Sequence, residues 1–422
     1  MTRAMKDSGI KWIGQIPENW KVSKIGWNSK FINGYAFKGE DLDIEKEVPV
    51  IRIGDIQQGT IDYTNCLKYD QNENLDAYRL KNKDIVIAMS GATTGKTAYL
   101  KESPLAYINQ RVGIVRGCSK YCYYCFQVDG FFQYISLLSA GSAQPNISMG
   151  QIQGFKIPFI SDKEQQKIAD YLDKRCEKID TAIDNQKQII EKLKEYKQSL
   201  ITETVTKGLN PNVKLKDSGI EWIGSIPEHW EIKKLKYLFK IKKNIAGKEG
   251  FDILSVTQSG IKIKDISTNE GQIAQDYSKY QIVNIDDFIM NHMDLLTGFV
   301  DCSHFNGVTS PDYRVFCQIE PTTNSNLYYN YIFQQCYKNK IFYGLGQGVS
   351  GLGRWRLPSD MFLNFTLPQP PLSEQKEIAE YLDKKCNQID EAIKQKEETI
   401  SKLEEYKKSL IFECVTGKKE VT

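Results

Sequence analysis

The sequence has no strong excess of charge of either sign. Lysine and arginine together number 56 and aspartate and glutamate 53, so the formal net charge is only +3. A protein that attracts polyanions through its overall field carries a larger basic excess. Charge therefore leaves the partner undecided. One dense basic stretch, KKLKYLFKIKK from Lys233 to Lys243, is a candidate for local contact.

Long apolar runs are also missing. No stretch approaches the ~18 residues that a transmembrane helix needs, and the opening residues MTRAMKDSGIKW lack the apolar core of a secretion signal. We therefore expect a cytoplasmic protein without membrane association, in which the ten cysteines are free thiols. Cys118, Cys122 and Cys125 have no fourth zinc ligand nearby, so we interpret them as packing residues.

Histidine is scarce, and catalytic signatures are weak. His229, His292 and His304 show neither metal-ligand spacing nor a neighbouring nucleophile motif. SGATTGKT (Ser90 to Thr97) is similar to a phosphate-binding loop, but its two glycines are one residue too close to wrap a phosphate. We interpret this stretch as a tight glycine turn.

Two short motifs are similar to those of adenine methyltransferases. SPDY (Ser310 to Tyr313) is one residue from the motif that holds the target amine, and FYGLG (Phe342 to Gly346) matches the cofactor glycine motif. A cofactor loop follows a strand and opens a helix, whereas a helical pattern precedes FYGLG and GVSGLGRWRLP follows it. We therefore expect no catalytic residue, cofactor site or metal site in this chain.

The chain is one unit duplicated. KDSGIKWIGQIPENW (Lys6 to Trp20) returns as KDSGIEWIGSIPEHW (Lys216 to Trp230) with 12 of 15 residues identical and an offset of 210. A second repeat, starting at Glu164 and Glu374, has the same offset and 23 of 40 identities. Two units of 210 residues account for nearly all of the 422 residues. We call the first repeat the head block, and its tryptophans are interpreted as packing anchors.

The second repeat predicts a long helix in each half. Apolar residues recur at alternating three- and four-residue steps from Ala169 to Leu200, and again from Ala379 to Leu410, which is a coiled-coil seam. Lys197 and Lys407 are polar residues at equivalent seam positions, a feature that commonly sets register and partner. Such a helix needs a partner, and the duplicate supplies one.

Between the head block and the helix, the two halves differ. Short β-like runs broken by glycine, asparagine and aspartate fill both regions, and Arg111-Val112 aligns with Arg314-Val315. The pattern predicts one β-rich fold that carries two different surfaces.

Taken together, the head block, the variable β-rich region with GATTGK or GVTSPDYRV, and the PPLSEQKEIAEYLD start of a long helix resemble the specificity subunit of type I restriction–modification enzymes. The resemblance covers nearly the whole chain. It implies an α+β fold with two β-rich target-recognition domains separated by two long antiparallel coiled-coil helices, in a pseudo-two-fold circular arrangement. The implied domains are residues 1–160 and 208–370, each with a head block, and the spacer helices 161–207 and 371–418.

The resemblance also implies a function and partners. Each recognition domain would read one half of an asymmetric, split target in double-stranded DNA, and the helices would dock methyltransferase subunits, expected to be two. A separate restriction subunit would carry the motor and nuclease, and S-adenosylmethionine would bind the methyltransferase. This chain itself would be non-catalytic.

Candidate DNA-binding residues are polar groups beside glycine turns, which can reach base edges or phosphates. Those of the first domain are Thr93, Thr94, Lys96, Asn109, Gln110 and Arg111, and those of the second are Asn291, Asp294, Thr297, Ser310, Asp312, Arg314, Arg354 and Arg356. Lys240, Lys242 and Lys243 are candidates for backbone contact. Because Arg111 and Arg314 align, they can equally be structural.

Two alternatives stay open from the residues. One is a pseudo-symmetric coiled-coil adaptor whose globular regions bind proteins rather than DNA, which the near-neutral charge favours. The other is a self-contained adenine methyltransferase, which the misplaced glycine motif disfavours.

Overall fold

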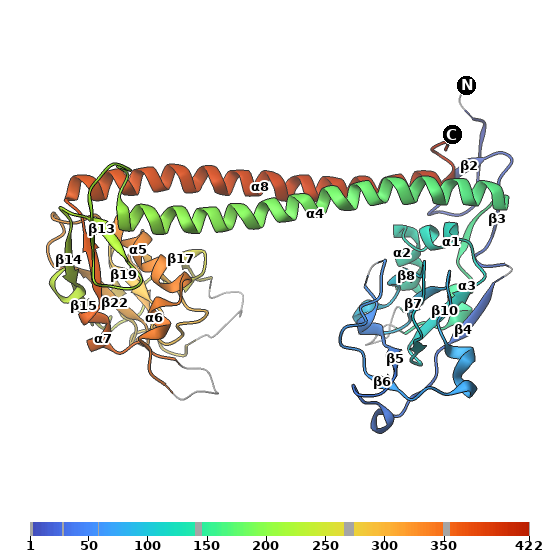
Figure 1. Ribbon diagram of the computed structural model, residues 1–422, viewed down its shortest axis with the longest axis horizontal. Helices are drawn as coiled ribbons and strands as arrows, with labels where there is room; N and C mark the ends of the chain where they lie inside the picture. The colour runs from blue at the N-terminus through green and yellow to red at the C-terminus, as the bar shows by residue number, and fades with distance from the viewer. Residues whose placement is uncertain are drawn as a thin grey trace. The chain divides into compact units, whose positions relative to one another are not determined.

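The computed structural model of the protein describes residues 3–27, 29–57, 59–139, 146–265, 274–348 and 355–421. The chain forms two compact units (Figure 1). The first unit contains residues 1–187 and 397–422, and the second contains residues 188–396. Each unit therefore combines one head block, one β-rich region and a segment from each of two long helices, α4 (Asp162–Lys207) and α8 (Leu372–Thr416).

The other described elements of the first unit are short. The strands are β1 (Met5–Asp7), β2 (Gln15–Pro17), β3 (Lys21–Lys24), β4 (Lys30–Asn33), β5 (Val48–Ile51), β6 (Lys68–Tyr69), β7 (Ile85–Ala88), β8 (Thr97–Tyr99), β9 (Tyr107–Ile108), β10 (Val112–Arg116) and β11 (Lys156–Phe159). The helices are α1 (Lys120–Cys125), α2 (Asp129–Leu138) and α3 (Met149–Gln153), with the 3-10 turns η1 (Gly39–Asp41), η2 (Ile53–Asp55), η3 (Glu73–Tyr78) and η4 (Gly91–Thr93).

A four-stranded antiparallel sheet of order β4-β10-β7-β8 forms the centre of this unit. Its two central strands, β7 and β10, are mostly apolar and buried on both faces because both faces are covered. Ile85 and Ile87 of β7 join the core shared with α1, α2 and the long helices, whereas Val86 and Ala88 join a second core on the opposite face. A three-stranded sheet of order β6-β5-β9 and a pair β11-β3 complete the β-rich region.

The second unit repeats this plan with different lengths. Its strands are β12 (Leu215–Asp217), β13 (Ser225–Pro227), β14 (Glu231–Lys234), β15 (Phe239–Lys242), β16 (Leu254–Thr257), β17 (Gly260–Ile263), β18 (Gln281–Val283), β19 (Phe288–Met290), β20 (Val300–Cys302), β21 (Gly307–Thr309), β22 (Arg314–Gln318) and β23 (Thr366–Gln369). Its helices are α5 (Asn326–Lys338), α6 (Ile341–Gly344) and α7 (Ser359–Asn364), with the turn η5 (Leu235–Tyr237). The central sheet, β15-β22-β19-β20, matches the sheet of the first unit strand for strand.

The two long helices pair as the seam pattern predicts, and they run antiparallel, as the family resemblance implies. In the first unit, Leu172, Cys176 and Ile179 of α4 share a core with Leu410 and Cys414 of α8. In the second, Ile201 and Val205 share a core with Leu382 and Cys386. The start of each helix therefore lies against the end of the other.

Lys197 and Lys407 form equivalent ion pairs on this helix pair. Lys407 Nζ lies 2.6 Å from Asp180 in the first unit, and Lys197 Nζ lies 2.6 Å from Asp390 in the second. Advancing 17 residues along α4, from Asp180 to Lys197, moves the partner 17 residues back along α8, from Lys407 to Asp390. The two polar seam residues therefore mark one antiparallel register, as expected.

The head blocks lie against the ends of the long helices. The buried Trp20 donates through Nε1 to Glu164 at 3.0 Å, and the buried Trp230 donates to Glu374 at 2.9 Å. Each tryptophan also packs on the glycine that ends the other helix, Trp20 on Gly417 and Trp230 on Gly208. The expectation that these tryptophans are packing anchors is confirmed by their burial.

One expectation about the cysteines is wrong. Cys118 and Cys122 lie four residues apart around the start of α1, close enough (Cα–Cα 6.2 Å) for the disulfide that joins them. The other eight cysteines are free thiols. Among the helices in the described part of the chain, none combines the length and the apolar character that crossing a membrane requires.

Candidate nucleic-acid interface

The predicted residues of the first domain meet at one edge of the central sheet. Because β7 and β10 are antiparallel, the end of β7 lies beside the start of β10, and Met89 N–H donates to the carbonyl of Arg111 at 2.9 Å. The turn from Thr93 to Lys96 follows β7, and Asn109 to Arg111 precede β10. We call this the first edge. It gathers all six candidates of the first domain.

The SGATTGKT stretch forms the tight turn that the sequence predicts. Gly91 and Gly95 adopt φ values of 74° and 87°, which favour glycine, and Thr94 Oγ1 donates to the carbonyl of Gly91 at 2.7 Å. Thr93 Oγ1 is buried without a hydrogen-bond partner in the described structure. Arg111 and Gln110 are exposed, so their side chains are the most available of the set.

Two further residues join the first edge that the sequence analysis missed. Tyr35, with 39% of its surface exposed, pairs with Asn109 in a short parallel bridge. Arg52 precedes η2, which packs on η4, and its side chain is 42% exposed. Neither residue lies beside a candidate in the sequence, so no local pattern could have identified them.

The second domain presents the equivalent edge. The end of β15, the end of β19 and the start of β22 lie together, because Lys242 pairs with Val315 and Met290 with Arg314. Lys243, Asn291 and the turn from Ser310 to Asp312 therefore occupy one edge of the sheet, which we call the second edge.

Several candidates at the second edge have structural partners. Asp294 accepts from the backbone N–H groups of Leu296 and Thr297 at 3.0 and 2.9 Å and from the Thr297 hydroxyl. These hydrogen bonds oppose the effect of burial and lower the pKa of Asp294. The buried Gln281 holds the turn that begins at Ser310 by donating to the carbonyls of Ser310 and Tyr313. The polar groups there are thus rigidly placed.

Arg314 and Lys242 are occupied inside the fold. Arg314 is 4% exposed and donates to the carbonyl of Leu357 at 2.8 Å and to the Ser359 hydroxyl at 3.2 Å. Burial lowers its pKa to about 10. Lys242 Nζ lies 2.5 Å from the buried Asp287. These two side chains are therefore not available for contact with DNA.

The remaining basic candidates of the second domain fall into two groups. Lys240 and Lys243 are exposed, and so is Arg356, whose backbone pairs with Gln347. Arg354 lies outside the described residues. Burial first, and then the nearby Arg314 and Arg356, lower the pKa of His292 to about 4, so this imidazole is neutral at physiological pH.

The opposite end of each sheet anchors the β-rich region to the long helices. After β10, α1 places the buried Tyr121 so that its hydroxyl donates to the carbonyl of Val415 at 2.8 Å. After β22, α5 places Tyr328 so that its hydroxyl donates to the carbonyl of Val205 at 2.9 Å. A five-residue strand, roughly 17 Å long, thus separates each edge from the helices.

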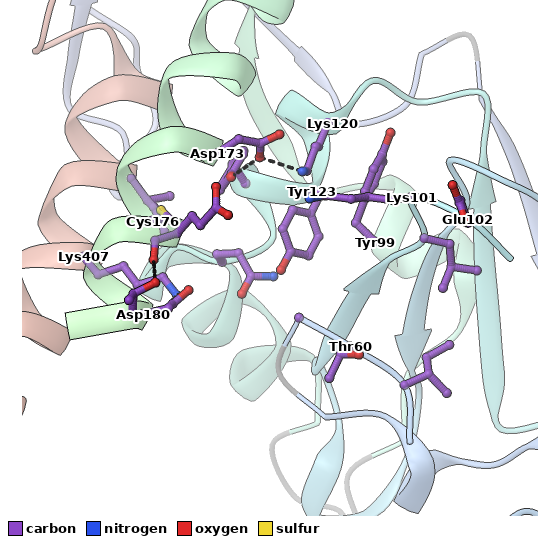
Figure 2. A pocket seen from close by; sticks show the side chains of 18 of the residues that line it. Thr60, Tyr99, Lys101, Glu102, Lys120, Tyr123, Asp173, Cys176, Asp180 and Lys407 are labelled. Atoms are coloured by element: carbon purple, nitrogen blue, oxygen red, sulfur yellow. Dashed lines mark hydrogen bonds and ion pairs between the residues drawn. The ribbon is translucent and has the colours of Figure 1, made fainter. Parts of the chain in front are cut away.

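A cleft of about 660 Å³ opens beside this anchor in the first unit (Figure 2). Asp173 of α4 accepts from Tyr124 at 2.5 Å and pairs with Lys120 at 2.6 Å, and the Asp180–Lys407 pair lies at the same wall. Tyr331 and Asp383 repeat the tyrosine–aspartate bond in the second unit at 2.5 Å. The cleft therefore belongs to the repeated anchor rather than to the variable edge.

The described residues offer no clear catalytic group. Burial raises the pKa of the Cys176 thiol in the cleft to about 11 and that of Cys66 to about 12, so both stay protonated at neutral pH. Within the described ranges, no three His, Cys, Asp or Glu side chains cluster as metal ligands. FYGLG lies in α6 and the turn after it, behind helix α5 rather than a strand, which agrees with the prediction that it is not a cofactor loop.

Comparison with known proteins defines the class. A family model described as the type I restriction modification DNA specificity domain matches residues 17–195 and again residues 227–402. These two matches cover most of the chain and reproduce its duplication. The chain belongs to the family of type I restriction–modification specificity subunits.

Individual relatives agree with this class at low identity. The chain is 27% identical over 219 residues to the StySPI specificity subunit of Salmonella potsdam, a match that covers 50% of this chain and 47% of that one. It is 24% identical over 428 residues to the MjaVIII specificity subunit of Methanocaldococcus jannaschii, with 96% and 94% covered. The match to the first relative thus spans about half of that protein's length.

A solved structure supports the fold. A chain from a study of complex assembly and conformational transition of the type I R-M system superimposes with a TM-score of 0.68 at 12% identity, covering 95% of this chain and 99% of that one. At this identity the likeness shows the fold alone. The predicted α+β architecture, with a duplicated β-rich region and two long paired helices, is confirmed.

Proposed function

We propose that this chain supplies DNA sequence specificity to a type I restriction–modification complex, with each β-rich region reading one half of a split, asymmetric target. The observation that carries this proposal is the contrast within each unit. The anchors on the long helices are the same in both units, from Trp20 and Trp230 to Tyr121 and Tyr328. The edges at the other end of the sheets differ in sequence and in loop length.

The proposed DNA surface consists of exposed and half-buried polar residues at the two edges. In the first domain we assign base or phosphate contact to Lys96, Gln110 and Arg111, together with Tyr35 and Arg52. In the second we assign it to Lys243, Asn291, Asp312 and Arg356. Arginine and asparagine suit base edges because each offers two hydrogen-bonding groups in one plane, whereas lysine suits phosphate.

Partners follow from the same assignment. We propose the domain division 1–160, 161–207, 208–370 and 371–418, in which the two helical segments dock two methyltransferase subunits and a separate restriction subunit completes the complex. S-adenosylmethionine and the methylation chemistry belong to the methyltransferase subunit in this scheme.

Methylation mapping tests the proposal. The chain is co-expressed with its methyltransferase subunit, and methylated adenines are mapped across the host genome. We expect one bipartite motif with two unlike halves. A preparation that methylates without sequence preference, or that reads a palindrome, contradicts the proposal.

Edge variants assign the halves. Arg111→Ala is expected to weaken recognition of one half-site by roughly tenfold to a hundredfold, because a good bidentate base contact contributes about 1–3 kcal/mol, and to leave the other half unaltered. Asn291→Ala is expected to affect the opposite half. Lys163→Ala is the control, since it removes an exposed charge at the start of α4, away from both edges. Equal loss at both halves from either edge variant would oppose the assignment.

A further inference from the structure

One disulfide lies at the anchor of the first unit. Cys118 and Cys122 are joined, whereas the other eight cysteines of the chain are free thiols. One of these is Cys125, three residues further along, which is fully buried. Burial raises the pKa of the Cys125 thiol, so it stays protonated and does not compete for the bridge. A single bridge among reduced cysteines is typical of a redox-active pair rather than of a structural framework.

The bridge encloses the residues that fasten the first β-rich region to the long helices. Between the two cysteines, Ser119 donates to Gln165 of α4 at 2.5 Å. Lys120 and Tyr121 follow, the first with its ion pair to α4 and the second with its hydrogen bond to α8. All three residues of the loop therefore hold one of the long helices. Because the bridge closes this loop, its state is coupled to the geometry of the anchor.

The second unit carries other residues at the equivalent positions. Tyr328 makes the contact in the second anchor that Tyr121 makes in the first, and it follows Tyr121 by 207 residues. At the same offset, Ser325 and Tyr329 stand in place of the two cysteines. The two anchors share their tyrosine contact, but only the first contains a covalent bond that a thiol is able to cleave.

A cavity of about 600 Å³ gives small molecules access to the bridge. Cys118 and Cys122 both line this cavity, although only 9% and 6% of their surfaces are exposed. The charged residues that line the same cavity are four cations and one acid, namely Lys24, Lys81, Lys83, Arg116 and Asp162. This excess of positive charge favours an anionic reagent over a neutral reagent of the same size.

We propose that Cys118 and Cys122 form a redox-active site whose substrate is a small anionic thiol of the glutathione class, and whose oxidation state controls the first anchor alone. The thiolate of one small molecule attacks a sulfur of the bridge, forms a mixed disulfide and releases the other cysteine, which takes a proton. A second small thiolate attacks the mixed disulfide and releases the remaining cysteine, which is also protonated. Two electrons thus pass to the bridge, and the two small molecules leave as their disulfide. The reverse sequence restores the bridge.

Cleavage of the bridge loosens the anchor, because the covalent constraint no longer limits the open conformations of the loop. The contacts of residues 119–121 with the long helices then break more often, whereas the second anchor is unchanged. If the first β-rich region reads one half-site, reduction weakens recognition of that half alone. This last consequence rests on the proposed function, but the redox site itself does not.

Thiol exchange in the folded protein tests the site. The purified full chain is incubated without denaturant at graded ratios of glutathione to glutathione disulfide, and free thiols are alkylated and located by mass spectrometry. We expect Cys118 and Cys122 to change together between the bridged and the alkylated form while the circular dichroism of the chain stays constant. A bridge that exchanges only in denaturant, or that does not re-form in glutathione disulfide, overturns the proposal.

Amide hydrogen exchange tests the effect on the anchor. Residues 119–126 of the reduced chain are expected to exchange roughly tenfold faster or more than those of the oxidised chain, within the usual effect of losing a disulfide. The equivalent segment of the second unit, residues 326–333, is the internal control and should exchange at one rate in both states. Equal rates for residues 119–126 in the two states contradict control of the anchor.

Two variants separate the bridge from the packing of its residues. The double variant Cys118→Ser, Cys122→Ala removes the bridge and introduces at position 118 the residue type of the second unit. It is expected to exchange like the reduced chain and to ignore glutathione. Cys317→Ser is the matched control, because it removes a free thiol of the second unit and should respond like the native chain. A response of residues 119–126 that survives in the double variant overturns the proposal.

Failure of the proposed function looks different. The complex with co-expressed methyltransferase subunit is assayed on duplexes that carry single changes in either half of the target, with the bridge oxidised or reduced. Reduction is expected to alter discrimination in one half, and equal loss in both halves contradicts control of the first anchor alone. If methylation lacks sequence preference while the bridge exchanges, the specificity role fails and the redox site stands. If methylation is specific and the bridge is inert to glutathione, the redox site fails and specificity stands.

Discussion

At the residue scale, two glycines end the long helices and allow the head blocks to pack against them. Gly208 and Gly417 follow the last turns of α4 and α8 with φ values of 74° and 73°, the left-handed conformation that ends many helices. A Cβ on Gly417 would lie 2.6 Å from Pro17 and 2.8 Å from Trp20, and one on Gly208 would lie 3.1 Å from Trp230. Glycine is required here for both conformation and space.

We predict that Gly417→Ala lowers the free energy of unfolding by about 1–3 kcal/mol. This is the cost of placing alanine in the left-handed conformation together with the cost of the steric clash that shifts the head block. Urea unfolding of the full chain, followed by tryptophan fluorescence, measures the change. Gly39→Ala is the control in the same unit, because a Cβ there meets nothing within 4 Å and φ is not positive. Equal stability of Gly417→Ala and Gly39→Ala would contradict the role assigned to Gly417.

Arg314 illustrates a limit of sequence reasoning at this scale. It aligns with Arg111, and the pattern left open whether either residue reads DNA or supports the fold. The structure separates them, since Arg111 is exposed while Arg314 lies over the Phe362 ring at 4.6 Å and bonds Leu357. Burial depends on α7, which packs from 45 residues away in the chain, so no local pattern encodes it.

At the scale of elements, the heptad pattern predicted the paired helices, and the family resemblance implied their antiparallel direction. The apolar seam residues from Ala169 to Ile190 are buried as the heptads predict, because a long apolar stripe on a helix is removed from water by packing against a second helix. The last turns of α4 bury Ile201 and Val205 and leave Leu200 partly exposed. There the helix also packs on the second head block, which the heptad pattern does not encode.

The ion pair between the helices makes a further prediction. Asp180→Lys places a second cation beside Lys407 and is expected to destabilise the first unit by about 1 kcal/mol, since both partners are partly exposed and screened. The double variant Asp180→Lys, Lys407→Asp restores the opposite charges and should recover most of that loss. A double-mutant cycle on unfolding free energies in low salt measures the coupling. A coupling of zero would show that Lys407 does not set register.

At the scale of the whole molecule, duplication gives one chain two unlike β-rich regions and one pair of long helices. The proposed function makes that pair a ruler, because helices of fixed length set the separation of the half-sites. Counted along the chain, the midpoint between the two lysine–aspartate pairs falls between residues 188 and 189 of α4 and between residues 398 and 399 of α8. Insertions at these two points lie opposite each other and preserve the pairing.

We predict that inserting one heptad after Gln188 and one after Glu398 lengthens the permitted gap between half-sites. Seven helical residues add roughly 10 Å, which is about three base pairs of DNA at 3.4 Å each. Both half-site sequences should stay the same, because neither edge changes. Methylation mapping of the co-expressed complex reads the gap and the half-sites in one experiment.

The heptad variant has its own control. A heptad inserted in α4 alone breaks the antiparallel register and should abolish sequence-specific methylation instead of shifting the gap. An unchanged gap preference in the paired insertion, with both half-sites still recognised, would contradict the ruler.

Sequence alone was sufficient for the duplication, the long paired helices, the tryptophan anchors and the family resemblance, because repeats and heptads are encoded by residues close together in the chain. Only the tertiary structure decided which polar side chains are exposed at an edge of the sheet and which are buried with partners inside the fold. Sheet pairing brings β7 beside β10 and β19 beside β22 from 24 or more residues apart, and burial then selects among the side chains gathered there. The proposed DNA surfaces consist of such long-range neighbours, and local sequence does not specify them.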